Sequence, residues 1–110
     1  MQLFTKGRTM TEGEIQKQIL KALPLHKNVA WLERINVGKV FIGKRFVTFG
    51  FKGCSDLVGQ MKDGRFLAIE VKKPRGKTTK EQRKFIELVQ TNGGVSGIAR
   101  SIYDALEIVK

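Results

Sequence analysis

Cysteine and histidine are almost absent from this sequence, which contains one of each, Cys54 and His26. A single cysteine cannot form an intramolecular disulfide, and this pair cannot supply the four ligands of a structural zinc site. Both side chains are therefore expected to fill structural positions. No apolar run approaches the roughly 20 residues that span a membrane, and no secretory signal pattern is found. The sequence predicts a soluble, cytoplasmic protein.

Acidic residues are also scarce, because ten Asp and Glu stand against 21 Lys and Arg and leave a formal charge of +11. This charge exceeds the magnitude of about 2–8 that suffices to keep a small domain soluble. Such an excess favours a polyanionic partner, usually nucleic acid. The chain has 110 residues, of which 41% are hydrophobic, and residues 1–110 are expected to form one folded domain.

Local capping patterns predict three helices. Thr11 and Glu14 form a capping box at the start of a helix over about 12–23. Thr79 begins a second Ser/Thr-x-x-Glu/Gln pattern before another amphipathic segment. Ser101 is the expected N-cap of a last helix.

Strands are expected between these helices. The segments WLERINVGKVF and RFVTFGF are rich in β-branched and aromatic residues and predict two paired strands between Val29 and Phe51. The apolar part of this region, Val40–Phe51, is either ordinary core or a subunit interface. A hairpin over 53–72 follows, and VSGIA at 95–99 is expected to lie parallel to its last strand. The order α-β-β-β-α-β-α predicts an α/β fold with a mixed β-sheet flanked by helices.

The hairpin sequence GCSDLVGQMKDGRFLAIEVKKP places ionisable groups between apolar residues. Side chains alternate along a strand, so Glu70 and Lys72 share a face. A two-residue turn at 63–64 would put Asp56 on the other face. A three-residue loop, with Gly64 in the left-handed conformation, would place Asp56 directly opposite Glu70. We favour the three-residue loop, because it also gathers the apolar side chains of both strands on one face.

Two carboxylates that face each other across a sheet are destabilising unless positive charge lies between them. Asp and Glu oxygens are the ligands that Mg²⁺ and Mn²⁺ prefer, and a bound metal ion activates water for attack on a phosphodiester. Lys72 would stabilise charge that develops on the phosphate. An isolated Glu-x-Lys is more often a solvated ion pair. Asp56, an apolar strand and a basic chain together favour a metal-dependent phosphodiesterase.

Three stretches resemble the VRR-NUC (virus-type replication-repair nuclease) branch of the PD-(D/E)xK nuclease superfamily: GCSDL at 53–57, IEVK at 69–72 and TTKEQRKFIELVQTNGG at 78–94. The resemblance covers roughly residues 11–109. Ser55 stands where the proline of the PD motif would be, and no Val-Arg-Arg signature is present. The resemblance implies a restriction-endonuclease-like core of the stand-alone type found in phages and bacteria, located in a bacterial cell or phage-infected host.

The same resemblance implies roles for single residues. The catalytic residues it implies are Glu14, Asp56, Glu70, Lys72 and Gln82. Asp56 and Glu70, with the Val71 backbone carbonyl, would bind Mg²⁺ or Mn²⁺, and Lys72 would be the catalytic lysine. Glu14 and Gln82 would contribute an acidic and a polar group, although both also fit capping boxes. Domains of this type resemble homodimeric Holliday junction resolvases, which implies a structure-selective DNA endonuclease.

Positive charge is concentrated directly after the Glu-x-Lys strand, where residues 72–84 carry seven Lys and Arg opposed only by Glu81. The nucleic-acid-binding residues expected here are Lys73, Arg75, Lys77, Lys80, Arg83 and Lys84. A solvated basic helix face is the alternative. Phosphate contacts carry no sequence information, so we expect recognition of DNA shape, as in four-way junctions or other branched DNA. A less selective duplex or flap nuclease, and a basic binding protein without catalysis, remain open.

Overall fold

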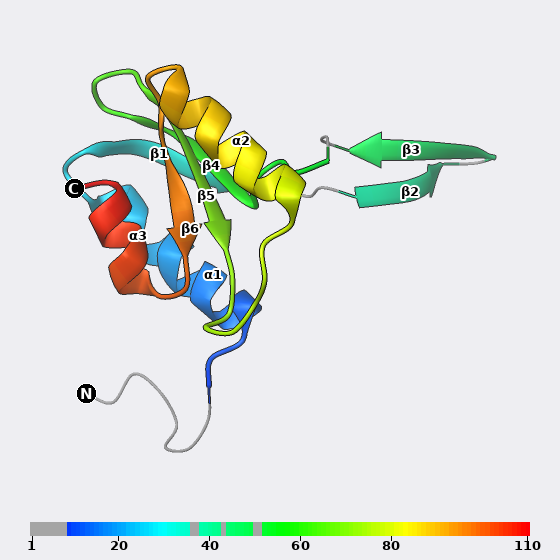
Figure 1. The fold of residues 1–110 in the computed structure, drawn as a ribbon, viewed down its shortest axis with the longest axis horizontal. Coiled ribbons are helices and arrows are strands. Elements are labelled where there is room, and N and C mark those ends of the chain that lie inside the picture. Colours follow the sequence, from blue (N-terminus) through cyan, green and yellow to red (C-terminus); the bar gives the residue numbers. More distant parts are fainter. Residues whose placement is uncertain (1–8, 36–37, 43, 50–51) are drawn as a thin grey trace.

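The computed structural model describes residues 9–35, 38–42, 44–49 and 52–110 of the chain (Figure 1). Its helices are α1 (Glu12–Ala22), the short 3-10 helix η1 (Leu23–Leu25), α2 (Lys80–Thr91) and α3 (Ile102–Ile108). Its strands are β1 (Val29–Arg34), β2 (Gly38–Ile42), β3 (Arg45–Phe49), β4 (Leu57–Met61), β5 (Phe66–Val71) and β6 (Val95–Ala99).

All three α-helices begin at the caps that the sequence predicted. The Thr11 hydroxyl accepts a hydrogen bond from the Glu14 backbone N–H at 3.2 Å, and the Glu14 carboxylate accepts one from the Thr11 N–H at 3.0 Å. Thr79 and Ser101 cap α2 and α3 through their hydroxyls in the same way. Each cap satisfies backbone donors that a first helical turn leaves without partners. Within the described ranges, no helix is long and apolar enough to cross a membrane.

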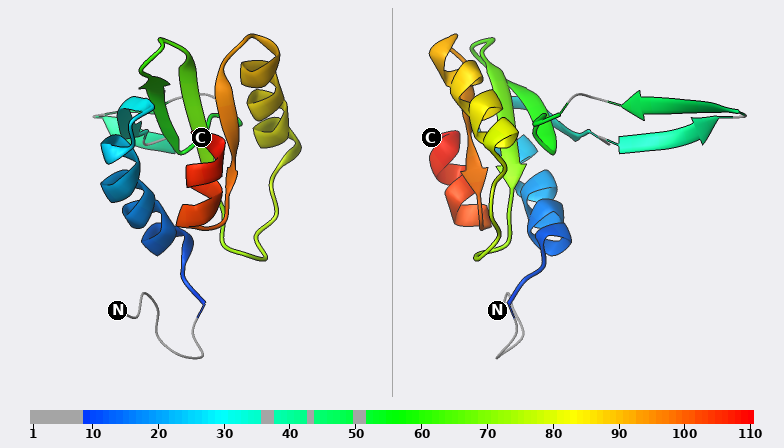
Figure 2. Two further views of the ribbon diagram at one scale, coloured as in Figure 1. Left: turned by 90° about the vertical axis from the view of Figure 1, so that its left-hand side faces the viewer. Right: turned by 45° about the vertical axis from the view of Figure 1, so that its right-hand side comes forward.

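Four strands form a mixed sheet in the order β1-β4-β5-β6. The pairs β1–β4 and β4–β5 are antiparallel, whereas β5 and β6 are parallel. Figure 2 shows α2 on one face of this sheet and α1 and α3 on the other. The predicted order α-β-β-β-α-β-α is therefore confirmed for the four-stranded sheet and its helices, as is the parallel strand.

The region between Val29 and Phe51 differs from the prediction of two strands, because it contains three. β1 pairs with β4, and the hydrogen bond from the Ile35 N–H to the Asp56 carbonyl at 2.8 Å continues that pairing. β2 and β3 instead pair with each other as a separate ribbon, which projects from the body in Figure 1. WLERINVGKVF thus supplies strands to two sheets. The side chains of these two strands lie outside the described residues, so the choice between core and interface for Val40–Phe51 stays a prediction.

The hairpin has the register that the three-residue loop predicts. Gly64 has a φ of 97°, its N–H donates to the Met61 carbonyl at 2.9 Å, and the Met61 N–H donates to the Arg65 carbonyl at 2.8 Å. Leu57 consequently pairs with Ile69. One residue further along the same register, Asp56 stands opposite Glu70.

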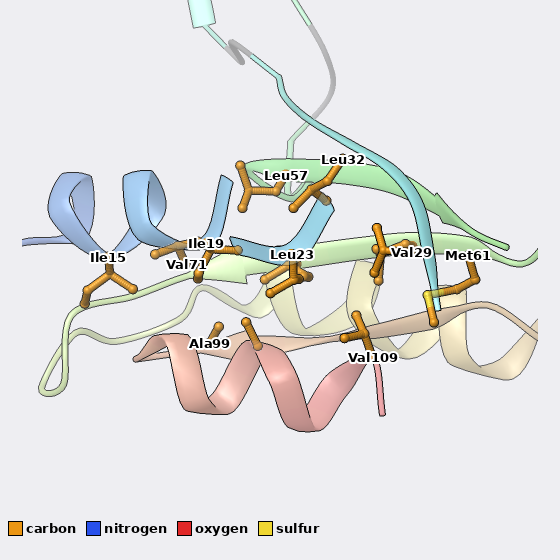
Figure 3. Close-up of a cluster of buried hydrophobic side chains, with 13 residues drawn as sticks. Ile15, Ile19, Leu23, Val29, Leu32, Leu57, Met61, Val71, Ala99 and Val109 are labelled. Carbon is orange, nitrogen blue, oxygen red and sulfur yellow. The ribbon is translucent and has the colours of Figure 1, made fainter. Parts of the chain in front are cut away.

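Alternate apolar residues of both hairpin strands face α1 and α3 and form the core (Figure 3). The largest fully buried aliphatic side chains of this cluster are Ile15, Ile19, Leu23, Val29, Leu57, Leu67, Ile69, Val71 and Val109. Their burial removes a large apolar area from water, which is the main stabilisation of a fold of this size. The same alternation turns Ala68 and Glu70 toward α2, on the opposite face.

Candidate active site

The two predicted carboxylates lie together at one end of the sheet. Asp56 immediately precedes β4, and its Oδ2 accepts a hydrogen bond of 3.1 Å from the Val71 backbone N–H. Glu70 lies near the end of β5 and is only 2% exposed. Its Oε1 accepts from Gln82, whereas its Oε2 is buried without a hydrogen-bond partner among the described residues. A buried carboxyl oxygen without a partner is costly in a native protein and points to a missing ligand.

The electrostatics of Glu70 agree with this geometry. Burial raises the pKa of Glu70 to about 8, and the negative charge of Asp56 acts in the same direction, while Lys72 acts in the opposite one. Without a cation, Glu70 therefore keeps its proton to a higher pH than an ordinary glutamate. Positive charge placed between the two carboxyl groups would reverse both unfavourable effects.

These donors fit a divalent cation such as Mg²⁺ or Mn²⁺. Asp56 and Glu70 supply hard carboxylate oxygens, and Mg²⁺ typically binds one or two carboxylates while keeping several waters. Across the described part of the chain, no three His, Cys, Asp or Glu side chains form a metal-binding group. Among the described residues, Asp56 and Glu70 are thus not part of a three-acid cluster, and Glu14 caps α1 through its carboxylate. A contribution from Glu14 or from the Val71 carbonyl stays a prediction.

Gln82 fills both roles that its sequence pattern suggested. Its side-chain oxygen accepts from the Thr79 backbone N–H at 2.8 Å and completes the capping box of α2. Its amide nitrogen donates to Oε1 of Glu70 at 2.9 Å. The first turn of α2 and the acid pair are therefore joined by one side chain, which holds one oxygen of Glu70 in place.

The loop that carries Asp56 is fixed by close packing that the sequence did not reveal. Gly53 has a φ of 88°, and a Cβ placed on it would lie 2.4 Å from the Glu81 carbonyl oxygen. The loop can therefore approach α2 only because this residue has no side chain. Ser55 is fully buried with its hydroxyl unpartnered among the described groups. Burial raises the pKa of the Cys54 thiol, and the negative charges of Glu70 and Asp56 add to that effect.

The predicted DNA-binding cations lie on the segment that joins β5 to α2 and on the first turns of α2. The structure describes these six residues: Lys73, Arg75, Lys77, Lys80, Arg83 and Lys84. The guanidinium of Arg83 donates to the Thr78 carbonyl at 2.7 Å and so is partly used within the protein. Lys72 is half-buried, and its backbone N–H donates to the Ala99 carbonyl at 3.0 Å. That these cations hold a phosphate chain close to the carboxylates stays a prediction.

Comparison with known proteins identifies the family of this chain. Among curated proteins, none matches this chain significantly. The family model described as VRR-NUC domain matches residues 10–102, a span that includes the acid pair, Lys72 and Gln82. Nucleases of this family are typically metal-dependent and act on DNA. Because the match covers most of the chain, the protein belongs to the VRR-NUC domain family, which implies a nuclease of the PD-(D/E)xK type.

Proposed function

We propose that this protein is a metal-dependent, structure-selective DNA endonuclease that cuts four-way (Holliday) junctions as a homodimer. The observation that carries the proposal is the pair formed by half-buried Asp56 and buried Glu70 beside Lys72, followed directly along the chain by a run of cations. A basic binding protein without catalysis would need the cations, but it would gain nothing from an acid pair that destabilises the sheet.

Each residue has a defined task in this proposal. Asp56 and Glu70 hold the divalent cation, preferably Mg²⁺ or Mn²⁺, and Gln82 keeps Glu70 oriented. When bound, the cation offsets phosphate charge and makes water a better nucleophile. Lys72 shares the face of Glu70 and stabilises negative charge on the phosphate during cleavage. The cations from Lys73 onward hold the DNA backbone, which gives affinity without reading base sequence.

Symmetric cleavage of a junction requires two strands to be cut, whereas one chain carries one Asp56–Glu70 pair. A two-fold homodimer supplies the second site in the matching orientation. The ribbon formed by β2 and β3 is our candidate subunit contact, because a two-stranded ribbon on its own is only marginally stable in water.

The test compares an end-labelled four-way junction with a linear duplex of matching sequence, each in Mg²⁺, in Mn²⁺ and in EDTA. Glu70→Gln removes the charge of the ligand with little change in shape, and Glu87→Gln, on the exposed side of α2, is the matched control. Paired symmetric nicks on the junction, absent in Glu70→Gln and in EDTA but kept in Glu87→Gln, would support the resolvase.

The other outcomes decide between the alternatives. Equal cleavage of both substrates would leave a nuclease without junction selectivity, which trims or nicks duplex or flap DNA. Binding without cleavage in either metal, by folded wild-type protein, would leave a basic nucleic-acid-binding protein. A monomer by light scattering on the junction would contradict the homodimer.

A further inference from the structure

Arg100 lies just after β6 and contacts a loop that is far away in the sequence. Its Nη1 donates to three backbone carbonyls, those of Lys73 at 2.9 Å, Pro74 at 3.3 Å and Gly76 at 2.7 Å. Hydrogen bonds from a charged donor are about twice as strong as those between neutral groups. One guanidinium nitrogen therefore binds three carbonyls of residues 73–76 and holds this part of the loop in one conformation.

The backbone of Arg100 is itself held by hydrogen bonds. The Arg100 backbone N–H donates to Oδ2 of Asp104 at 2.9 Å, and the Asp104 N–H donates to the Ser101 hydroxyl at 3.1 Å, within the cap of α3. On the other side of the contact, the Gly76 N–H donates to the Lys73 carbonyl at 2.9 Å and closes a turn. Arg100 thus fastens that turn to the junction of β6 and α3.

The loop 73–77, which contains this turn, carries three of the proposed DNA-binding cations next to the acid pair. It leaves β5 directly after Lys72, follows the end of the sheet and returns to α2, as Figure 1 and Figure 2 show. Lys73, Arg75 and Lys77 all lie on it. Mutual repulsion of three neighbouring cations favours an extended, variable segment, so an ordered turn here needs an anchor.

We infer that Arg100 is a positioning residue for DNA binding: it fixes the loop 73–77 so that Lys73, Arg75 and Lys77 meet the phosphate backbone together. This inference rests on the proposed function. The loop carries the cations, and Arg100 contributes by holding it in the one conformation in which all three cations reach phosphates together.

The competing role for Arg100 is that of one more phosphate ligand, and the two roles predict different salt dependence. Each phosphate that a protein neutralises on duplex DNA adds about 0.9 to the slope of log affinity against log salt. If Arg100 binds a single phosphate, Arg100→Gln should therefore reduce the slope by about one. If Arg100 orders the loop, the slope should fall by about two or more, because several cations then leave their phosphates together.

The experiment uses Arg100→Gln, Arg100→Lys and the control Arg65→Gln. Arg65 pairs with Asp63 at 2.8 Å at the hairpin turn, so its substitution makes the same charge change at the opposite end of β5. Equilibrium binding to a fluorescent four-way junction is measured from low to high salt in EDTA, without cleavage. We expect about tenfold weaker binding and the larger fall in slope for both Arg100 variants, whereas the slope of Arg65→Gln should fall by no more than about one.

Limited trypsin digestion supplies a readout that does not depend on DNA. Trypsin can cut after Arg75 and Lys77, but Pro74 blocks cleavage after Lys73. The two informative cleavage sites are therefore those after Arg75 and Lys77, in the loop 73–77. We expect cleavage at these two sites to be at least several-fold faster in both Arg100 variants, with the rate in Arg65→Gln unchanged. Unchanged digestion, or an Arg100→Lys variant that binds DNA like wild type, would overturn the inference.

The wild-type protein provides a test that a misfolded variant cannot obscure. Amide hydrogen exchange should show protection at the Gly76 N–H, which the turn requires, and exchange there at the rate of an open chain would overturn the inference. Failure of the proposed function is recognised separately, because a wild-type protein that never cuts DNA can still show a protected loop and the expected trypsin pattern.

Discussion

The side-chain nitrogen of Gln82 donates a hydrogen bond of 2.9 Å to Oε1 of Glu70, while the oxygen of the same amide caps the helix that carries it. A glutamate could provide the cap equally well, but it could not donate to Glu70. The amide therefore satisfies two requirements that a carboxylate at this position could not meet together.

Replacement of Gln82 tests this dual role. In Gln82→Glu the side-chain oxygen that caps α2 remains, but the donor to Glu70 is lost and a third carboxylate joins Asp56 and Glu70, so we expect the metal-free protein to lose about 1–3 kcal/mol of stability. DNA cleavage should fall by about 10–100-fold, the usual effect of losing a group that orients a metal ligand. Thr79→Ala is the converse control, because it removes the hydroxyl that accepts from the Gln82 backbone N–H. It should lower stability by about 1 kcal/mol with little change in cleavage. Equal activity of both variants would contradict a positioning role.

Stability of the metal-free protein should depend on Glu70. The folded-state pKa of Glu70 is about 8, above its ordinary value of 4.5, so its contribution is fully present below pH 4.5 and is lost as the pH rises through about 8. Glu70→Gln should remove this pH dependence. Urea unfolding in EDTA from pH 5 to pH 9 should show the wild type weakening relative to the variant. Parallel curves would show that burial does not hold the proton on Glu70.

Metal binding should reverse that trend. A divalent cation that binds only the folded protein stabilises it by about 2.7 kcal/mol at one hundred times its dissociation constant. Mn²⁺ should therefore raise the melting temperature of wild type and of Glu87→Gln, but not that of Glu70→Gln. EDTA should abolish cleavage while DNA binding persists. An equal rise in all three proteins would place the cation elsewhere.

Gly53 should be more sensitive than another glycine with the same backbone conformation. Gly53→Ala introduces both a left-handed alanine and a Cβ that would lie 2.4 Å from the Glu81 carbonyl oxygen. Gly64→Ala introduces the conformation alone, because nothing lies within 4 Å of its Cβ among the described residues. We expect about 1 kcal/mol of destabilisation for Gly64→Ala and clearly more for Gly53→Ala, measured by urea unfolding. Only Gly53→Ala should also reduce cleavage, since its loop carries Asp56.

Ser55 gives a prediction in the opposite direction. Its hydroxyl is buried and unpartnered among the described groups. Ser55→Ala therefore removes a polar atom whose transfer from water is not offset by a hydrogen bond. We expect unchanged stability or a gain of up to about 1 kcal/mol, measured by thermal unfolding, with cleavage retained. Destabilisation by more than about 1 kcal/mol would show that the hydroxyl has a partner, such as an ordered water.

Much of the fold was predictable because its signals are local. The capping boxes at Thr11 and Thr79 lie within four residues, and they form as the sequence predicts. The hairpin register followed from Gly64 and from the alternation of apolar residues, since a shift of one residue would have exposed the apolar face. The division of WLERINVGKVF between two sheets was not predictable, because the residues that pair with β1 lie far along the chain, on β4.

By itself, the sequence determined the helix starts and the excess of positive charge, and it favoured the turn that makes Asp56 face Glu70. Tertiary structure decided the burial, the pKa and the hydrogen-bond partners of those groups. The pKa of Glu70 depends on burial, and its partner Gln82 arrives on a helix that begins only after the basic loop. The contact of Arg100 with the Lys73 carbonyl joins residues 27 positions apart. Desolvation and long-range hydrogen bonds exist only once distant segments pack, and no local pattern encodes them.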